Sequence, residues 1–140
     1  ITEMSRIPDY DALTAACAQP LPEIAIKGLE LFNAGEYYEC HHALEEAWNK
    51  DQGAGRNLYK GILQVAVAYF QIGRGNYNGG VKLLLRMQQW LDPLPDTCRG
   101  INIKQLRNDA MHVYQVLQET GPEAIAEFDT TLFKPVKYDH

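Results

Sequence analysis

Gly35-Glu36-Tyr37-Tyr38-Glu39-Cys40-His41-His42-Ala43-Leu44-Glu45-Glu46-Ala47-Trp48 is the stretch of this chain that says most about its fold. On an α-helix, at about 100° per residue, one side carries four large side chains: Tyr37, His41, Leu44 and Trp48. This stripe predicts a helix that turns His41 toward the core, with Glu45 one turn further on. Burying an imidazole without a polar partner is costly. We therefore expect a polar site inside a helical core.

Segments with helical periodicity lie on both sides of this stretch and are separated by glycine and proline. The predicted helices cover residues 22–33, 36–49, 57–73, 76–91 and 103–120, with short ones before Pro20 and up to Phe128. The helix over 57–73 is apolar on nearly all sides, which is typical of the centre of a bundle. No alternating run is long enough to predict a strand. The fold class is therefore all-α.

A short motif repeats along the chain, because Gly35-Glu36-Tyr37 and Gly75-Asn76-Tyr77 each end one predicted helix and begin the next. This pattern indicates antiparallel helical hairpins stacked on one another. We expect a compact bundle of about five to seven helices built from such hairpins. A length of 140 residues fits one domain over residues 1–140.

Composition excludes several classes of partner. Hydrophobic residues make up 46% and charged residues 22% of the chain, as in an ordinary globular protein. The net charge is −5 and no run of Lys or Arg occurs, so we expect no nucleic-acid partner. The longest mostly apolar segment, Ile62 to Ile72, is too short to span a bilayer, so we expect no membrane insertion.

The three cysteines, Cys17, Cys40 and Cys98, lie far apart and are odd in number. No Cys-x-x-Cys pair is present, which excludes a structural zinc site of the usual spacing. We therefore expect reduced thiols and a cytoplasmic protein. Cys40 is interpreted as a small core residue, because neighbouring helical residues diverge too far for it to share a proton with His41.

His41 and Glu45 are the strongest candidates for chemistry. They are four residues apart, so their side chains lie one above the other on the helix. The carboxylate can orient the imidazole and stabilise its charged form, as a general base requires. Gln64, the main polar residue of the apolar helix over 57–73, is a plausible third member. A purely structural role, in which Glu45 and Gln64 satisfy a buried histidine, stays open.

The same helix also carries two residue patterns of the kind that bind metals. Glu39-x-x-His42 has the spacing of one unit of a di-iron bundle, but such sites need a second unit. The only other candidate, Asp109-x-x-His112, directs its histidine away from the apolar stripe of its own helix. A mononuclear site would take two ligands from one pair, His41 with Glu45 or His42 with Glu46, and the rest from other helices. We assign no metal ligands.

Two motifs resemble those of the domain of unknown function family 309. They are Phe32-Asn33-Ala34-Gly35-Glu36-Tyr37-Tyr38-Glu39-Cys40-His41 with Leu44-Glu45-Glu46-x-Trp48, and Gly61-Ile62-Leu63-Gln64-Val65-Ala66-Val67-Ala68 followed by Arg74-Gly75-Asn76-x-x-Gly79. The resemblance covers residues 29–91. It implies an all-helical bundle with a polar cluster where the two motif helices meet. The cluster contains Glu39, His41, Glu45, Trp48 and Gln64, and Tyr38 is added as a ligand-binding candidate.

The resemblance supplies a fold and a site but no reaction. The family usually has Glu directly after the motif histidine, where this chain has His42, so a role of that Glu as base or metal ligand would be altered here. Three functions therefore stay open. The first is binding of a small molecule or a protein partner through His41, Glu45 and Gln64. The second is acid–base or metal-assisted hydrolysis, with His41 as base oriented by Glu45. The third is a structural or adaptor bundle. Whether a cofactor binds stays open, as does a homo-oligomer.

Overall fold

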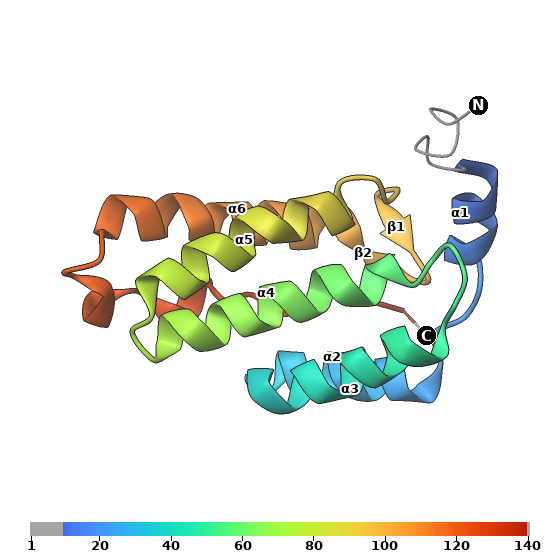
Figure 1. Cartoon of the computed structure of the whole chain (residues 1–140), viewed down its shortest axis with the longest axis horizontal. Helices are drawn as coiled ribbons and strands as arrows, with labels where there is room; N and C mark the ends of the chain where they lie inside the picture. Colours follow the sequence, from blue (N-terminus) through green and yellow to red (C-terminus); the bar gives the residue numbers. More distant parts are fainter. Residues whose placement is uncertain (1–9, 140) are drawn as a thin grey trace.

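Six α-helices, two very short strands and two 3-10 helices make up the part of the chain that the structure, a computed structural model, describes, residues 10–139. They are α1 (Tyr10–Cys17), α2 (Glu23–Asn33), α3 (Tyr37–Lys50), α4 (Asn57–Gly73), α5 (Tyr77–Leu91), β1 (Thr97–Cys98), β2 (Ile101–Asn102), α6 (Ile103–Thr120), η2 (Ile125–Glu127) and η3 (Thr130–Leu132). The helices α2 to α6 run back and forth along the long axis of the molecule (Figure 1). The predicted all-α bundle of antiparallel hairpins is confirmed.

The repeated glycine motif forms the two sharpest helix-to-helix turns. Gly35, between α2 and α3, and Gly75, between α4 and α5, have φ angles of 79° and 87°, a region that favours glycine. After Gly35, the Glu36 N–H donates to the carbonyl of Leu31 at 2.9 Å, which satisfies an open carbonyl at the end of α2. After Gly75, the Asn76 N–H donates in the same way to the carbonyl of Gln71 at 2.8 Å. The two hairpins therefore share one turn geometry.

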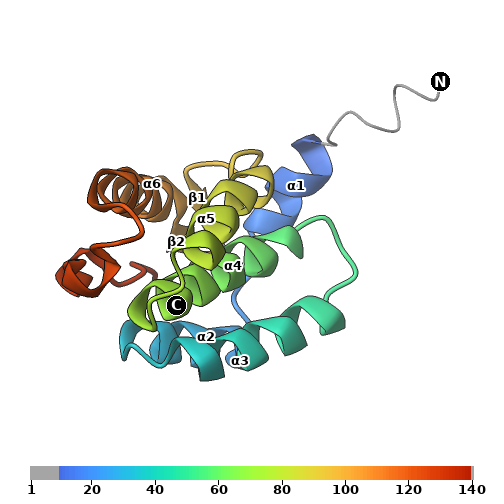
Figure 2. The ribbon, with the colours of Figure 1, turned by 60° about the vertical axis from the view of Figure 1, so that its left-hand side comes forward.

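Helix α4 lies at the centre of the bundle, as its apolar circumference predicts. The α2–α3 hairpin packs on one side of it, and α5 followed by α6 lies on the other (Figure 2). Close approach of α4 and α5 depends on Gly61, where a Cβ atom would overlap the side chain of Leu91. Because α4 touches both neighbouring helices, a side chain near its α3 side can take part in a site between the two.

The C-terminal segment folds back along the bundle after α6. The ring of Phe133 stacks on Tyr69 of α4 with centroids 4.4 Å apart. Further on, the Val136 N–H donates to Oδ1 of Asn33 at 2.7 Å, and Nδ2 of Asn33 donates to the Val136 carbonyl at 2.9 Å. This segment therefore packs on α4 and is fixed to the end of α2.

Two expectations from the sequence about the segment before α6 were wrong. Strands β1 and β2 form an antiparallel hairpin, with Cys98 opposite Ile101, although no strand was predicted. Each strand has only two residues, too few to produce an alternating pattern. Cys17 and Cys98 form a disulfide across 81 residues of sequence, in place of the reduced thiols expected. The third thiol, Cys40, is free and buried in the core, as predicted.

None of the helices within residues 10–139 combines the length and the apolar character that a transmembrane crossing requires.

Candidate functional site

Helix α3 turns a different side to the core from the one predicted. Its buried residues are Cys40, Ala43, Leu44 and Ala47. The side chain of His41 is 29% exposed and lies at the edge of this buried side, so the expectation that His41 faces the core was wrong. The reason is helix packing. The small residues let α2 come close, because a Cβ atom on Gly28 of α2 would lie 2.7 Å from the side chain of Leu44.

Polar side chains nevertheless lie close to His41, as its position predicts. Its Nε2 atom lies 3.2 Å from a carboxylate oxygen of Glu45, and its ring lies edge-on to His42 with centroids 5.1 Å apart. Partial burial, helped by the nearby His42 and Lys60 charges, lowers the pKa of His41 below 6.5 even though Glu45 acts in the opposite direction. The ring is therefore neutral at pH 7, and a neutral ring that carries its proton on Nε2 offers Nδ1 as an acceptor.

Helices α3 and α4 meet along their length in an antiparallel arrangement that fixes where Gln64 lies. At one end, the rings of Tyr38 and Phe70 are 5.6 Å apart. At the other end, Nζ of Lys60 on α4 lies 5.2 Å from the ring centroid of Trp48 on α3. Trp48 is ten residues after Tyr38, and Lys60 is ten residues before Phe70. Gln64, one turn after Lys60, therefore lies level with Glu45.

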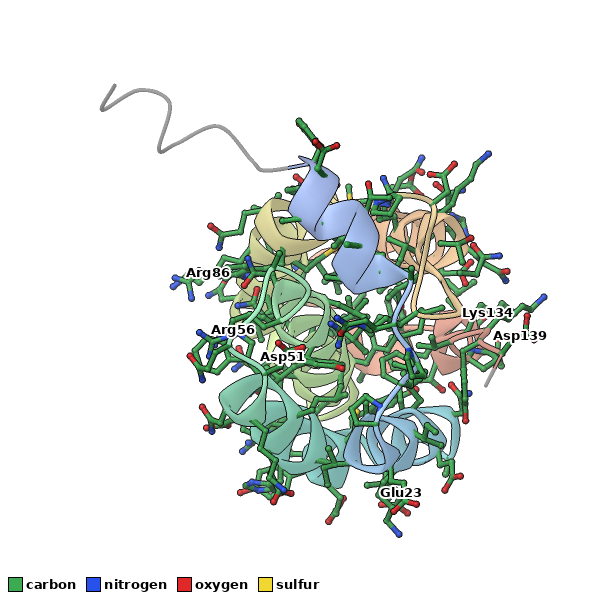
Figure 3. The ribbon with its side chains drawn as sticks, turned by 90° about the vertical axis from the view of Figure 1, so that its right-hand side faces the viewer. Glu23, Asp51, Arg56, Arg86, Lys134 and Asp139 are labelled. Carbon is green, nitrogen blue, oxygen red and sulfur yellow. A yellow bond between two sulfur atoms is a disulfide. The ribbon has the colours of Figure 1, made fainter. Side chains whose placement is uncertain are left out.

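Trp48 is covered by cations. The guanidinium carbon of Arg56 lies 3.7 Å from the centroid of the indole ring, a cation–π contact, and Arg56 Nη2 donates to the Trp48 carbonyl at 3.1 Å. Arg56 comes from the loop between α3 and α4, whose other end is Asp51. Figure 3 shows Arg56 at the edge of the molecule and Asp51 further in. The guanidinium of Arg56 thus covers Trp48 at this end of the site.

Seven side-chain polar atoms within residues 10–139 are buried without a hydrogen-bonding partner, and three of the seven belong to residues named above. These three are Nε1 of Trp48, Nε of Arg56 and Oε1 of Gln64. A buried polar atom without a partner costs about 1–3 kcal/mol. Most buried polar atoms in native proteins do have a partner, so each exception needs an explanation. A donor and an acceptor left open on facing helices are what a site lacking its ligand would present.

The other predicted site residues lie at the margin. Tyr38 is exposed and contacts His42, with ring centroids 4.9 Å apart, and Glu39 is exposed one turn before the middle of α3. The Cys40 thiol is not a nucleophile, since burial raises its pKa to about 12. The structure thus pairs His41 with Glu45, places Trp48 one turn further along α3, and places Gln64 on the facing helix α4, whereas Tyr38 and Glu39 lie toward the start of α3. We call His41, Glu45, Trp48 and Gln64 the α3–α4 site.

A second polar cluster was missed by sequence reasoning. Its centre is Arg99, in the turn between β1 and β2, which is only 6% exposed. Its Nη1 donates to Oδ2 of Asp51 at 2.9 Å and to the hydroxyl of Tyr59 at 2.7 Å, and its Nε donates to the Ala16 carbonyl at 2.9 Å. The three partners come from the α3–α4 loop, α4 and α1. This cluster therefore joins α1 and the β1–β2 turn to α4 and the loop before it.

The backbone of Arg99 is unusual as well. Its φ angle is +52°, and Gly100 after it has +81°, as a two-residue hairpin turn of the primed type requires. Asn, Asp or Gly usually occupies the first position, because other side chains cost about 1 kcal/mol there. Arg99-Gly100 followed by Ile101 was the only sequence signal, and it gives no hint of Asp51 and Tyr59, which lie 48 and 40 residues away.

The α3–α4 site lies within a segment shared with other proteins. Residues 25–83 match the family described as "Domain of unknown function (DUF309)". A protein of Aquifex aeolicus (strain VF5), described as uncharacterized, is 29% identical over 77 residues, 54% of this chain and 23% of that protein. The uncharacterized protein YpuF of Bacillus subtilis (strain 168) is 38% identical over 65 residues, 45% of this chain and 37% of YpuF.

The chain thus spans less than two-fifths of either relative's length. The matched segment contains every predicted site residue, from Tyr38 to Gln64, together with both glycine turns. The disulfide partner Cys98 and Arg99 lie outside it. The resemblance stated from the two motifs is confirmed as a resemblance: the family match over residues 25–83 includes both motifs.

Proposed function

We propose that this protein binds a small-molecule ligand at the α3–α4 site. The observation that carries the proposal is the pair of open hydrogen-bonding atoms, the donor Nε1 of Trp48 and the acceptor Oε1 of Gln64. A ligand that carries an acceptor and a donor side by side, as an amide does, would satisfy both. Binding then recovers free energy that the unliganded site forgoes.

The charges around the site support a polar ligand. Glu45 supplies a carboxylate beside His41, and Arg56 and Lys60 supply cations beside Trp48. Both open atoms are buried in the structure, so a ligand reaches them when the guanidinium of Arg56 swings away from the indole ring. Long side chains on a surface change rotamer readily. We therefore expect Arg56 to change position when ligand binds.

Trp48 can report on this binding directly. The chain has two tryptophans, so Trp90→Phe leaves Trp48 as the single indole reporter. A fragment library of small amides and related polar molecules would be screened on that variant by fluorescence and by thermal shift. A fragment that binds the α3–α4 site shifts both signals on Trp90→Phe, and loses its effect when Gln64→Leu is added.

The matched control is the neighbouring histidine. His41→Ala should weaken binding of such a fragment, whereas His42→Ala, an exposed histidine on the same helix, should not. Circular dichroism would show that both variants keep the fold. Equal binding by the parent, His41→Ala and Gln64→Leu would remove the site from consideration.

Acid–base catalysis is the second candidate, favoured by the neutral state of His41 and the 3.2 Å contact with Glu45. A base of this kind should hydrolyse p-nitrophenyl acetate faster than free imidazole does. The rate should fall in His41→Ala and shift along the pH axis in Glu45→Gln. Elemental analysis of the purified protein tests the metal-assisted version, since a stoichiometric metal is then required.

Three further proposals complete the functional picture. Residues 1–140 act as one domain, the protein works in the cytoplasm, and it forms no complex with nucleic acid. The disulfide means that reduced thiols no longer support a cytoplasmic location, so fractionation of cells is the deciding measurement for location.

An adaptor role would need a continuous apolar patch. The large apolar side chains exposed within residues 10–139, however, lie on three separate helices: Tyr10, Tyr38 and Leu85.

A further inference from the structure

A cavity of about 430 Å³ lies beside the Arg99 cluster, on the side of the molecule opposite the turns at Gly35 and Gly75. It opens between the segment before α2 and the end of α3, and it is lined by Gln19, Pro20, Pro22, Ile24, Ala47, Lys50, Asp51, Gln52, Tyr59 and Arg99. This volume falls within the range of small-molecule sites. None of the four residues of the α3–α4 site lines it.

The cavity has an apolar side and a polar side. Pro20, Pro22, Ile24 and Ala47 supply the apolar side. The polar side carries Arg99, paired with Asp51 at 2.9 Å, and the exposed Lys50, which is paired with Glu46 at 3.2 Å outside the lining. Because Arg99 is buried, its charge acts on a bound molecule with little screening by water. The buried Arg99 guanidinium, and not a net charge of the lining, therefore favours an anionic acceptor group.

Asp51 itself is fully engaged. Its Oδ1 accepts from the Gly53 N–H at 2.8 Å, and its Oδ2 accepts from Arg99 Nη1 at 2.9 Å. These bonds leave the carboxylate ionised, because together they lower the pKa of Asp51 although burial alone would raise it. Asp51 therefore acts as a fixed partner that orients Arg99 and leaves other donors to a ligand.

Two donors at the floor of the cavity have hydrogen atoms to spare. A guanidinium has five N–H groups. Arg99 uses four of them within residues 10–139, and the fourth bond, from Nη2 to Gln19, is long at 3.3 Å. The Tyr59 hydroxyl accepts from Arg99, so its own hydrogen can be donated elsewhere. A carboxylate can accept from both groups at once.

We propose that this cavity binds a small monocarboxylate with an apolar body. The carboxylate accepts hydrogen bonds from Nη2 of Arg99 and the hydroxyl of Tyr59, and Lys50 at the rim adds a second positive charge. The apolar body of the ligand packs against Pro20, Pro22 and Ile24. This site is separate from the α3–α4 site and does not depend on the function proposed there.

Benzoate is the probe, and benzyl alcohol is its neutral counterpart with the same ring. Titration into the ¹⁵N-labelled full chain would be followed by the backbone amides of Asp51 and Gln52 and by the Arg99 side-chain signal. For a ligand of so few atoms we expect a dissociation constant in the millimolar range. Benzyl alcohol should bind about tenfold more weakly, since a neutral hydroxyl accepts hydrogen bonds from Arg99 and Tyr59 more weakly than a carboxylate does.

Tyr59→Phe removes the donor and keeps the ring, and it should weaken benzoate binding about fivefold to tenfold. The matched control is Tyr69→Phe, a buried tyrosine of the same helix that lines no part of this cavity and should bind benzoate as the parent does. Lys50→Gln, at the exposed rim, should cause a smaller loss that disappears at high salt.

Three results would overturn the proposal. The first is the absence of saturable shifts at Asp51 and Gln52 with benzoate at tens of millimolar. The second is equal affinity for benzyl alcohol, which would indicate an apolar pocket only. The third is a Tyr59→Phe variant that keeps the fold, as judged by its spectrum, and binds benzoate as strongly as Tyr69→Phe.

Discussion

Arg99 donates a hydrogen bond to Asp51 across 2.9 Å, and this contact joins a turn outside the family segment to a loop inside it. The loop that begins at Asp51 ends near Arg56, which covers Trp48. A single short loop thus lies between the Arg99 cluster and the α3–α4 site. We expect a substitution at one end of this loop to alter the contacts at the other end.

Reduction of the Cys17–Cys98 disulfide should destabilise the protein. The bond closes a loop of 81 residues, for which the chain-entropy model gives about 4.5 kcal/mol. We expect a lower melting temperature in dithiothreitol, measured by circular dichroism. In the Cys17→Ser/Cys98→Ser double variant, dithiothreitol should have no further effect. A parent protein whose melting temperature ignores the reductant would show that the bond contributes nothing to stability.

Asp51→Asn should lower stability near neutral pH by about 2 kcal/mol, because Arg99 then keeps its buried charge without a carboxylate. The pKa of Asp51 is lowered from 3.8 in the folded protein. The stabilisation it gives is therefore complete above pH 3.8 and is lost as the pH falls through the lowered value. Urea unfolding between pH 7 and pH 2 should show this loss in the parent and not in Asp51→Asn. Asp92→Asn, an exposed carboxylate after α5, should behave like the parent.

Gly55→Ala should destabilise the protein by about 1–3 kcal/mol. A Cβ atom at this position would lie 2.6 Å from Nη2 of Arg99 and 3.1 Å from Cβ of Ala16, so the Arg99 side chain would have to move. Gly73→Ala is the matched control, since nothing lies within 4 Å of the Cβ atom it adds. If both variants unfolded at the same urea concentration, Arg99 would not be held as tightly as its contacts indicate.

His41 should titrate below pH 6.5, because partial burial lowers its pKa. The unfolded chain takes up this proton first as the pH falls, so neutral His41 favours the folded state at neutral pH, and that contribution falls below about pH 6.5. Glu45→Gln should lower the pKa of His41 further, since Glu45 acts to raise it. Proton NMR of the imidazole signals measures both values. A rise of the His41 pKa in Glu45→Gln would contradict the assigned effect of the carboxylate.

Helix positions could be predicted from the sequence because they depend on local patterns. The expected segments 57–73 and 103–120 coincide with α4 and α6, whose apolar periodicity and bounding glycines are strong signals. The orientation of α3 could not be predicted in the same way. The large apolar residues of α3 predicted a buried stripe that includes His41. In the structure, close packing of two helices places the small residues Cys40, Ala43 and Ala47 on the buried side.

The candidate site likewise contains residues that could be predicted from the sequence and residues that could not. His41 with Glu45, and Gln64 on the next motif helix, could be found because helical spacing and the family motifs place them. Arg56 over Trp48 could not, because a loop gives no periodic signal for where its side chains go. The Arg99 cluster could not either, since its partners meet only through long-range packing. Long-range contacts of this kind need an alignment or coordinates.

The bond between Cys17 and Cys98 encloses helices α2 to α5 in a covalent ring. A force applied to the chain outside this ring passes through the sulfur atoms and bypasses the four helices. Stretching from Tyr10 and Asp139 would therefore extend only α1 and the segment after Cys98, and the family segment would remain mechanically shielded until the bridge is broken.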